Sequence, residues 1–209
     1  MKKVAVAVLA FAILLMCAAV APVMAIEPAV VDCYFRAATK ADLDDGEFWW
    51  TGGDTILHVR GLTRLDALFY GPTLKIGEAL IITNYDFNTK TGKGNFIRTW
   101  EITFIEPVIF PSGNPAGIPN PYGIGTLEGK EVGVATRIKF QIPGWAGLSL
   151  CDFTGKLVAT HGTGDFEKAK LMADTVGFPL PPPPFKPLFV GIDVGGSLAE
   201  PTGKLTFHG

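Results

Sequence analysis

Apolar and polar residues alternate with a period of two along much of the chain, and such alternation is typical of β-strands with one buried face. In the segment 94–104 (GNFIRTWEITF), one face is apolar and holds Phe96, Trp100, Ile102 and Phe104. The opposite face is polar and holds Thr99, Glu101 and Thr103. In the segment 131–140 (EVGVATRIKF), Val132, Val134, Ile138 and Phe140 take one face, and Glu131, Arg137 and Lys139 take the other. Apolar repeats at helical spacing are almost absent, so the pattern predicts an all-β protein.

Glycine and proline, with 25 and 16 residues, divide the chain into short segments. A polar, glycine-containing connection at residues 88–93 predicts a hairpin between 77–87 and 94–104. A second hairpin is expected over 123–140, with its turn at Glu128-Gly129-Lys130. Residues 106–122 hold several prolines and predict a long surface loop across one end of the sheet.

The stretch HGTGDFEKAKL raises the question of a phosphate-binding loop. No Gly-Lys-Ser/Thr follows it, and no third glycine has the spacing of a nucleotide-binding fold. We therefore predict a third hairpin that turns at Gly162-Thr163-Gly164, with a short helix over 165–177 as the alternative.

The two ends of the predicted domain also look like strands. Residues 29–37 (AVVDCYFRA) and 203–209 (GKLTFHG) are expected to pair and to remove exposed sheet edges. The fold class predicted is a single antiparallel β-barrel of about eight strands that spans residues 26–209. The proline run at 179–187 favours polyproline II and is interpreted as a stiff connector.

The first 25 residues have the order of a secretory signal peptide. Lys2 and Lys3 precede the apolar run 4–20, and Val23-Met24-Ala25 is a small-x-small cleavage site. The sequence thus predicts a secreted or extracytoplasmic protein cleaved after Ala25, without a transmembrane span in the mature chain. The alternative is an uncleaved N-terminal membrane anchor.

Charge and cysteine content narrow the possible partners. The net charge is −2 and no basic stripe is present, so nucleic acid is not an expected partner. Cys33 and Cys151 remain after cleavage, and an even pair in an exported chain predicts one disulfide bond. Two separate buried thiols are the alternative.

The combination GTLEGKEVGVATRIKF and HGTGDFEKAKL resembles the later strands of the dirigent and allene-oxide-cyclase-like group of barrels. The resemblance covers residues 123–175. It implies an eight-stranded antiparallel barrel whose apolar cavity binds a hydrophobic molecule and steers its coupling or cyclisation. No functional residue of that group is carried over, and the long prolyl loop and the proline run depart from its compact pattern.

Residues for covalent chemistry are scarce. Ser112, Ser149 and Ser197 lie outside any Gly-x-Ser-x-Gly motif, so no catalytic nucleophile is predicted. The histidines His58, His161 and His208 are not spaced as metal ligands, and neither a metal nor a cofactor is expected.

Four residues are candidates for ligand binding. Arg98 shares the apolar face of its strand with Trp100 and would hold an anionic ligand head near the barrel mouth, or else would snorkel past the rim. Trp49 and Trp50 would form an aromatic platform for sugar or lipid, or would plug the barrel end.

These observations predict a non-catalytic exported barrel that binds a small apolar or amphipathic ligand in the barrel or at its rim. Two alternatives stay open. One is a structural or surface-interaction protein with a filled barrel, and the other is a cyclase or isomerase of the allene-oxide-cyclase-like group.

Overall fold

The computed structural model describes residues 29–44, 46–138, 150–179 and 197–207. These residues form one antiparallel sheet and contain no helix. The strands, in chain order, are β1 (Ala29–Tyr34), β2 (Arg36–Asp44), β3 (Glu47–Thr51), β4 (Ile56–Tyr70), β5 (Leu74–Asn88), β6 (Lys93–Ile109), β7 (Gly125–Ile138), β8 (Leu150–Gly164), β9 (Lys170–Pro179) and β10 (Ser197–Phe207). The all-β prediction is therefore confirmed for the described residues.

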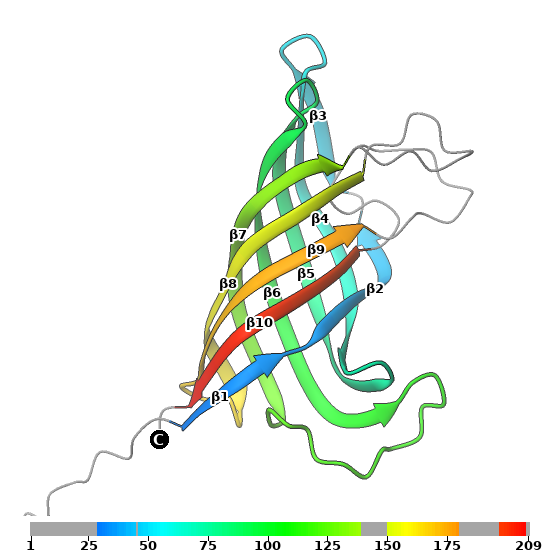
Figure 1. Cartoon of the computed structure of the whole chain (residues 1–209), viewed down its shortest axis with the longest axis vertical. Helices are drawn as coiled ribbons and strands as arrows, with labels where there is room; N and C mark the ends of the chain where they lie inside the picture. The colour runs from blue at the N-terminus through cyan, green and yellow to red at the C-terminus, as the bar shows by residue number, and fades with distance from the viewer. Residues whose placement is uncertain (1–28, 45, 139–149, 180–196, 208–209) are drawn as a thin grey trace, which may run out of the picture.

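From β4 to β10 each strand pairs with the next one along the chain. β1 and β2 follow one another along the same edge of β10 without a shift in register, since Tyr34 faces Thr202 and Ala37 faces Ala199. β10 pairs with β9 along its other edge. The predicted pairing of the first strand with the last is confirmed, and Figure 1 shows β10 between β9 and β1 on the curled sheet.

The inner face of the sheet carries the core, and its largest side chains come from aromatic residues and arginines. β6 contributes four consecutive inward positions with bulky side chains, as its alternation predicts: Phe96, Arg98, Trp100 and Ile102. The facing strand β7 supplies Gly129 and Gly133 at its own inward register positions. A Cβ atom at Gly133 would lie 2.5 Å from Cζ of Phe96, so small residues on β7 make room for large ones on β6.

The predicted hairpin over 123–140 is wrong, because β7 runs without a turn from Gly125 to Ile138. Gly129 does not turn the chain. It lies beside the register shift between β7 and β8, where a Cβ atom would be 2.7 Å from the carbonyl oxygen of Val158. Glycine within a strand marks such a bulge or a close backbone approach as readily as it marks a turn.

The face of β7 that carries Val132 and Val134 points outward. Val132 and Val134 are exposed, and Glu131 is completely buried. Pairing with β6 decides this orientation, because Glu131 faces Arg98 across the ladder and opposed residues lie on the same side of a sheet. Alternation gives the period of β7, but valines and charged residues fit either face until the partner strand is known.

The hairpin of β5 and β6 has its predicted connection, and the hairpin of β8 and β9 is confirmed with its turn displaced. Gly162 and Gly164 belong to β8, and the chain turns over 165–168, where Lys168 has a φ of 62°. The alternative helix over 165–177 is wrong, since Lys170–Pro179 is β9. Strand pairing with β10 outweighs the weak helical tolerance of this segment.

The predicted prolyl loop begins later than expected, because β6 extends to Ile109. Residues 110–124 then cross to β7 outside the strands. Tyr122 ties this loop to the junction of β1 and β2, since its hydroxyl donates to the carbonyl oxygen of Tyr34 at 2.5 Å and accepts from the N–H of Tyr34 at 3.0 Å. Burial raises the pKa of Tyr122 to about 12, which keeps this donor protonated.

The predicted disulfide bond is absent, because Cys33 carries a free and buried thiol. In the sheet, Cys33 faces Gly203, Gly203 faces Ala173, and Ala173 faces Leu157 of β8. Cys151 lies six residues further along β8, which is roughly 20 Å at the rise of a strand. A disulfide needs Cα atoms within about 7 Å, so the register forbids the bond.

The predicted signal peptide, its cleavage site after Ala25 and most of the proline run at 179–187 lie outside the described residues. The described residues form no helix with the length and apolar character needed to cross a membrane.

Candidate functional site

Four ionisable side chains lie on the inner face, and we call them the inner cluster: Arg64, Asp66, Arg98 and Glu131. All four are almost inaccessible to solvent, and they contribute two positive and two negative formal charges. Buried charges are found in proteins where they are paired and hydrogen-bonded, because desolvation otherwise costs several kcal/mol per ion.

Glu131 is the centre of the hydrogen bonding in the inner cluster. Its carboxylate accepts from Trp100 Nε1 at 2.7 Å and from the Thr175 hydroxyl at 2.5 Å, and it lies 3.5 Å from Nη1 of Arg98. Gly155 leaves the space for this arrangement. A Cβ atom at Gly155 would lie 2.8 Å from Oε1 of Glu131 and 2.9 Å from Oγ1 of Thr175.

Arg98 is enclosed by aromatic rings as well as by Glu131. Its guanidinium carbon lies 4.5 Å from the ring centre of Phe96 and 4.1 Å from that of Phe153, within the range of cation–π attraction. Burial lowers the pKa of Arg98 to about 10, although the charge of Glu131 works in the opposite direction. The alternative that Arg98 snorkels past the rim is wrong, because none of its surface reaches solvent.

Asp66 and Arg64 form the second pair of the inner cluster, with Nε of Arg64 3.0 Å from Oδ1 of Asp66. Burial raises the pKa of Asp66, and the charges of Arg64 and Arg98 oppose this shift without cancelling it. The inner face therefore holds a carboxyl group that takes up a proton more readily than an exposed aspartate.

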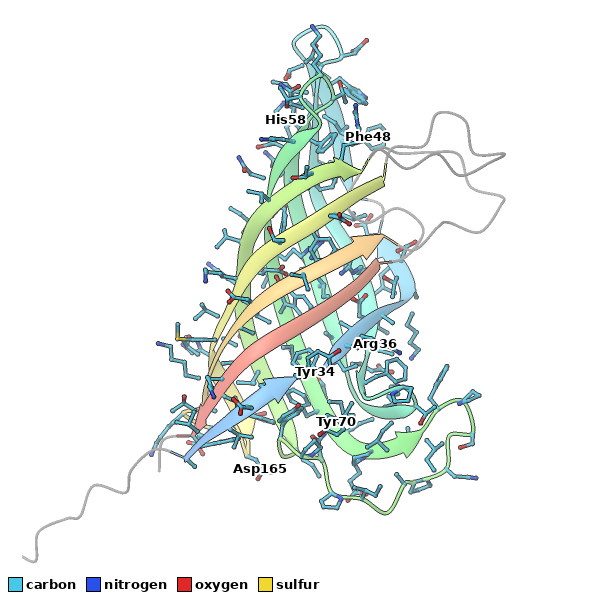
Figure 2. All side chains as sticks on the ribbon, viewed as in Figure 1. Tyr34, Arg36, Phe48, His58, Tyr70 and Asp165 are labelled. Atoms are coloured by element: carbon cyan, nitrogen blue, oxygen red, sulfur yellow. The ribbon has the colours of Figure 1, made fainter. Side chains whose placement is uncertain are left out.

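A different environment surrounds the hairpin of β3 and β4. Phe48, Trp49 and Trp50 are consecutive on β3 and expose 49%, 43% and 40% of their surface. Because neighbours on a strand point to opposite faces, Trp49 lies on the outer face and the other two rings on the inner side. Figure 2 shows Phe48 and His58 at the same end of the molecule, far from Tyr70 and Asp165 at the other end.

On the outer face, Trp49 packs against two polar side chains of β4. Its ring is stacked on that of His58, with 5.1 Å between ring centres and 15° between the planes. The guanidinium carbon of Arg60 lies 5.4 Å from the Trp49 ring centre. Trp49 is thus held by ring stacking and a cation–π contact while part of its surface stays open to solvent.

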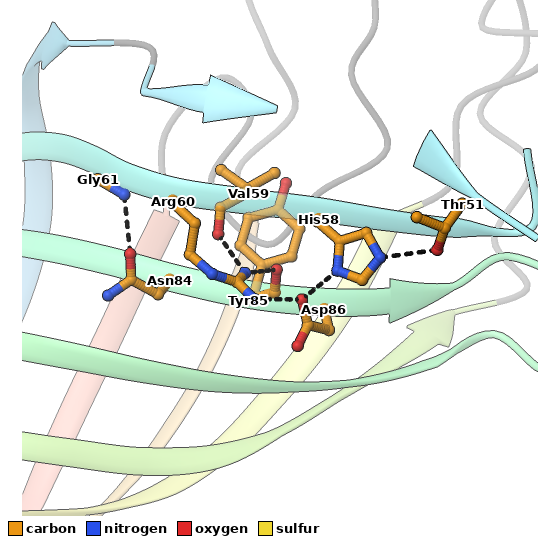
Figure 3. Close-up of polar contacts among 8 residues, drawn as sticks. All are labelled: Thr51, His58, Val59, Arg60, Gly61, Asn84, Tyr85 and Asp86. Atoms are coloured by element: carbon orange, nitrogen blue, oxygen red, sulfur yellow. Dashed lines mark hydrogen bonds and ion pairs between the residues drawn. The ribbon is translucent and has the colours of Figure 1, made fainter. Parts of the chain in front are cut away.

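His58 connects a hydroxyl group to a carboxylate (Figure 3). Its Nε2 is 2.8 Å from Oγ1 of Thr51, and its Nδ1 is 2.6 Å from Oδ1 of Asp86. Nη2 of Arg60 donates to the same carboxylate oxygen at 2.8 Å. Partial burial works to raise the pKa of Asp86, but the hydrogen bonds from Arg60 and His58 outweigh it and hold the pKa below its usual value.

The four predicted ligand-binding residues therefore fall into two environments. Arg98 and Trp100 are completely buried, and both contact the carboxylate of Glu131. Trp49 and Trp50 are exposed on β3. The contact of Thr51, His58 and Asp86 was not predicted, although His58 was considered as a metal ligand, because the three residues come from three strands. The signal that locates them is register, because His58 faces Trp49 on one side and Asp86 on the other.

The other histidines do not gather at a site with His58 within the described residues. His161 lies on β8, away from His58 on β4, and His208 lies outside the described residues. Within the described part of the chain, no group of three histidine, cysteine, aspartate or glutamate side chains is arranged to hold a metal ion.

Comparison of the chain with protein-family models, with curated proteins and with solved structures gave no match.

Proposed function

We propose that the protein is an exported β-barrel protein that binds a small amphipathic ligand at the end of the barrel that carries Phe48, Trp49 and Trp50. The ligand would wrap around the end of the β3–β4 hairpin, with Trp49 on its outer face and Trp50 on its inner side, and would form hydrogen bonds with neighbouring polar groups. This assignment places recognition at the rim and gives the interior a mainly structural role.

Strand pairing supports closure of the sheet into a barrel. β10 has a partner along both edges, with β9 on one side and β1 and β2 on the other. β2 in turn pairs with β4, and Asp44 and Glu47 share one register along β4, so β2 and β3 act as one strand position. Counted in this way, the pairing runs through about eight strand positions, the size of a small up-and-down barrel.

Side-chain placement supports binding at the rim rather than inside. Large side chains occupy the inner face, including Trp100, Phe104 and Phe153, and Arg98 already faces Glu131 and two rings. The exposed aromatic stretch at β3 is the observation that carries the proposal. Aromatic residues at such a density give a large contact area at low cost in conformational entropy.

Titration of the purified protein with 1-anilinonaphthalene-8-sulfonate, an amphipathic fluorescent probe, tests this proposal. We expect saturable binding by the native protein and at least a tenfold weaker affinity in the Trp49→Ala/Trp50→Ala variant. Phe110→Ala is the matched control, since Phe110 is also an exposed aromatic residue but lies in the 110–124 loop. Unchanged affinity in the double variant would refute binding at the rim.

A second candidate function is a cyclase or isomerase reaction inside the barrel, and the raised pKa of the buried Asp66 favours it. Such a reaction needs an acid or base in an apolar site. Native mass spectrometry of the purified protein and of its solvent extract separates the two functions. A copurified apolar molecule whose retention is lost in Asp66→Asn but kept in the Trp49→Ala/Trp50→Ala variant would favour the reaction inside the barrel.

A further inference from the structure

We propose that Thr51, His58 and Asp86 form a hydrolytic site on the outer face of the β3–β4 hairpin, with Thr51 as the nucleophile. The substrate class is small esters with an apolar or aromatic acyl group. This activity goes beyond ligand binding, and it does not depend on the interior of the sheet.

The atoms that meet are those that nucleophilic catalysis requires. An ionised carboxylate only accepts hydrogen bonds, so Nδ1 of His58 donates to Oδ1 of Asp86 at 2.6 Å. In the neutral imidazole this leaves Nε2 as an acceptor, and the Thr51 hydroxyl lies 2.8 Å from it. Nucleophile, base and orienting acid thus follow in the order found in hydrolases with a hydroxyl nucleophile.

The acid and the base are both held in place by neighbours. Arg60 donates to Asp86 and also, through Nη1, to the carbonyl oxygens of Val59 and Tyr85. The lowered pKa of Asp86 keeps its carboxylate ionised, which maintains the tautomer of His58. Stacking on Trp49 fixes the plane of the imidazole, so the geometry does not depend on the hydrogen bonds alone.

The chemical step is an ordinary acyl transfer. His58 Nε2 takes the hydroxyl proton as Oγ1 of Thr51 bonds to the ester carbonyl carbon. The bond from that carbon to the alcohol oxygen then breaks, and the imidazolium returns the proton to the leaving alcohol. In the second half, Nε2 takes a proton from water, the hydroxide displaces Thr51 from the acyl group, and the proton passes back to Oγ1 of Thr51.

The surroundings of Thr51 suit the acyl group of such an ester. Trp49 and Thr51 are two residues apart on β3 and therefore lie on the same face, so an apolar or aromatic acyl group would contact the exposed part of the Trp49 ring. Gly52 and Gly53 follow at once in left-handed conformation, in a turn where Thr55 N–H donates to the carbonyl oxygen of Thr51. Their N–H groups follow Thr51 directly in the sequence and are the backbone donors that would be tested first as partners of a developing oxyanion.

The chain also contains a natural control. Oγ1 of Thr160 lies 3.1 Å from His161, but the contact is to Nδ1, and in the part of the chain that the structure describes no carboxylate is bonded to that histidine. Both residues are exposed. The Thr160–His161 pair thus has the same residue types without the orienting acid.

Reaction of the purified protein with diisopropyl fluorophosphate, followed by intact mass and peptide mapping, tests the proposal. We expect one adduct, on Thr51. Thr51→Val should abolish it, and His58→Gln should slow it about 100-fold, the scale of general-base catalysis. Thr51→Ser should keep or accelerate labelling, and Thr160→Val should leave the rate unchanged. Hydrolysis of 4-nitrophenyl benzoate, whose acyl group is aromatic, should follow the same order.

Far-UV circular dichroism of each variant shows whether the sheet is retained. The absence of an adduct on the folded native protein would overturn the proposal. So would an adduct on another residue, or labelling of Thr51 at an equal rate in His58→Gln. Loss of probe binding in Trp50→Ala, whose ring lies on the opposite face of β3 from Thr51, without any effect on Thr51 labelling would leave this site standing and separate it from the proposed binding function.

Discussion

The inner cluster and the outer face of the β3–β4 hairpin use similar side chains in opposite surroundings. Each pairs arginine with a carboxylate and places an aromatic ring against a guanidinium group. In the inner cluster the charged groups are buried, whereas Asp86 and Arg60 at the hairpin leave 49% and 39% of their side chains exposed.

This difference in exposure gives the inner cluster a structural role and leaves the hairpin available for recognition of a ligand. In the interior, a carboxylate satisfies donors from the surrounding strands, so its removal leaves a buried cation and unpaired donors. At the hairpin, water replaces whatever contact is lost, and the same groups remain available to a ligand. The comparison predicts large stability effects inside and small ones at the hairpin.

The largest effect is expected for Glu131→Ala. It removes the anion beside Arg98 and the acceptor of Trp100 Nε1 and Thr175, so the free energy of unfolding should fall by about 3–5 kcal/mol. Urea unfolding followed by circular dichroism measures this change. Glu131→Gln keeps the shape and one acceptor and should lose less.

The matched control for Glu131 is Lys156→Ala, which breaks the exposed pair of Lys156 and Asp174 on the outer face of β8 and β9. An exposed pair contributes about 0–1 kcal/mol. If both alanine variants lost equally little, the inner cluster would not be a structural element.

Gly155→Ala should have an intermediate effect. Its Cβ atom would meet Oε1 of Glu131 and Oγ1 of Thr175 at less than 3 Å, and forcing them apart should cost about 1–3 kcal/mol. Combining it with Thr175→Ala, which removes the hydroxyl that the new Cβ atom would meet, should not restore full stability because the Glu131 contact remains. Thermal unfolding of the two variants would check this, and a fully stable Gly155→Ala protein would contradict the described packing.

The smallest effect concerns pH, and here the two regions should respond in opposite directions. The pKa of Asp66 is raised on folding, so its contribution to stability is present at low pH and is lost as pH rises through the folded pKa. The pKa of Asp86 is lowered, so its contribution is present above the usual value of about 3.9 and is lost as pH falls through the folded pKa.

Urea unfolding of the native protein, Asp66→Asn and Asp86→Asn over a pH series measures both trends. As the pH is lowered, the stability of the native protein should rise relative to Asp66→Asn and fall relative to Asp86→Asn. The change for Asp86 should stay below about 1 kcal/mol because that group is half exposed. Parallel trends in the two variants would show that the two regions do not differ electrostatically.

The sequence predicts the strands better than the site, for physical reasons that individual residues illustrate. Phe96, Trp100 and Ile102 could be assigned to one face, because period-two alternation is a local property of a strand. The orientation of Glu131 could not, since it depends on Arg98 of the neighbouring strand. Local patterns carry no information about which residues of different strands meet.

Strand register also explains two further differences between the sequence-based predictions and the structure. The predicted disulfide assumed that Cys33 and Cys151 would meet, but β9 and β10 lie between their strands. The contact of Thr51, His58 and Asp86 needs β3, β4 and β5 to align within one residue, because a slip of one position would turn the side chains to the opposite face. A sequence that predicts turns to within a few residues cannot specify such a contact.

Recognition at the rim can be tested by following indole N–H signals in ¹H–¹⁵N correlation spectra of the purified protein during titration with 1-anilinonaphthalene-8-sulfonate. Single tryptophan-to-phenylalanine variants assign the signals. We predict that the signals of Trp49 and Trp50 shift in a saturable way, and that the signal of Trp100, whose Nε1–H donates to Glu131, does not move. A saturable shift of the Trp100 signal, with no shift of the Trp49 and Trp50 signals, would place the ligand against the inner face of the sheet and contradict recognition at the rim.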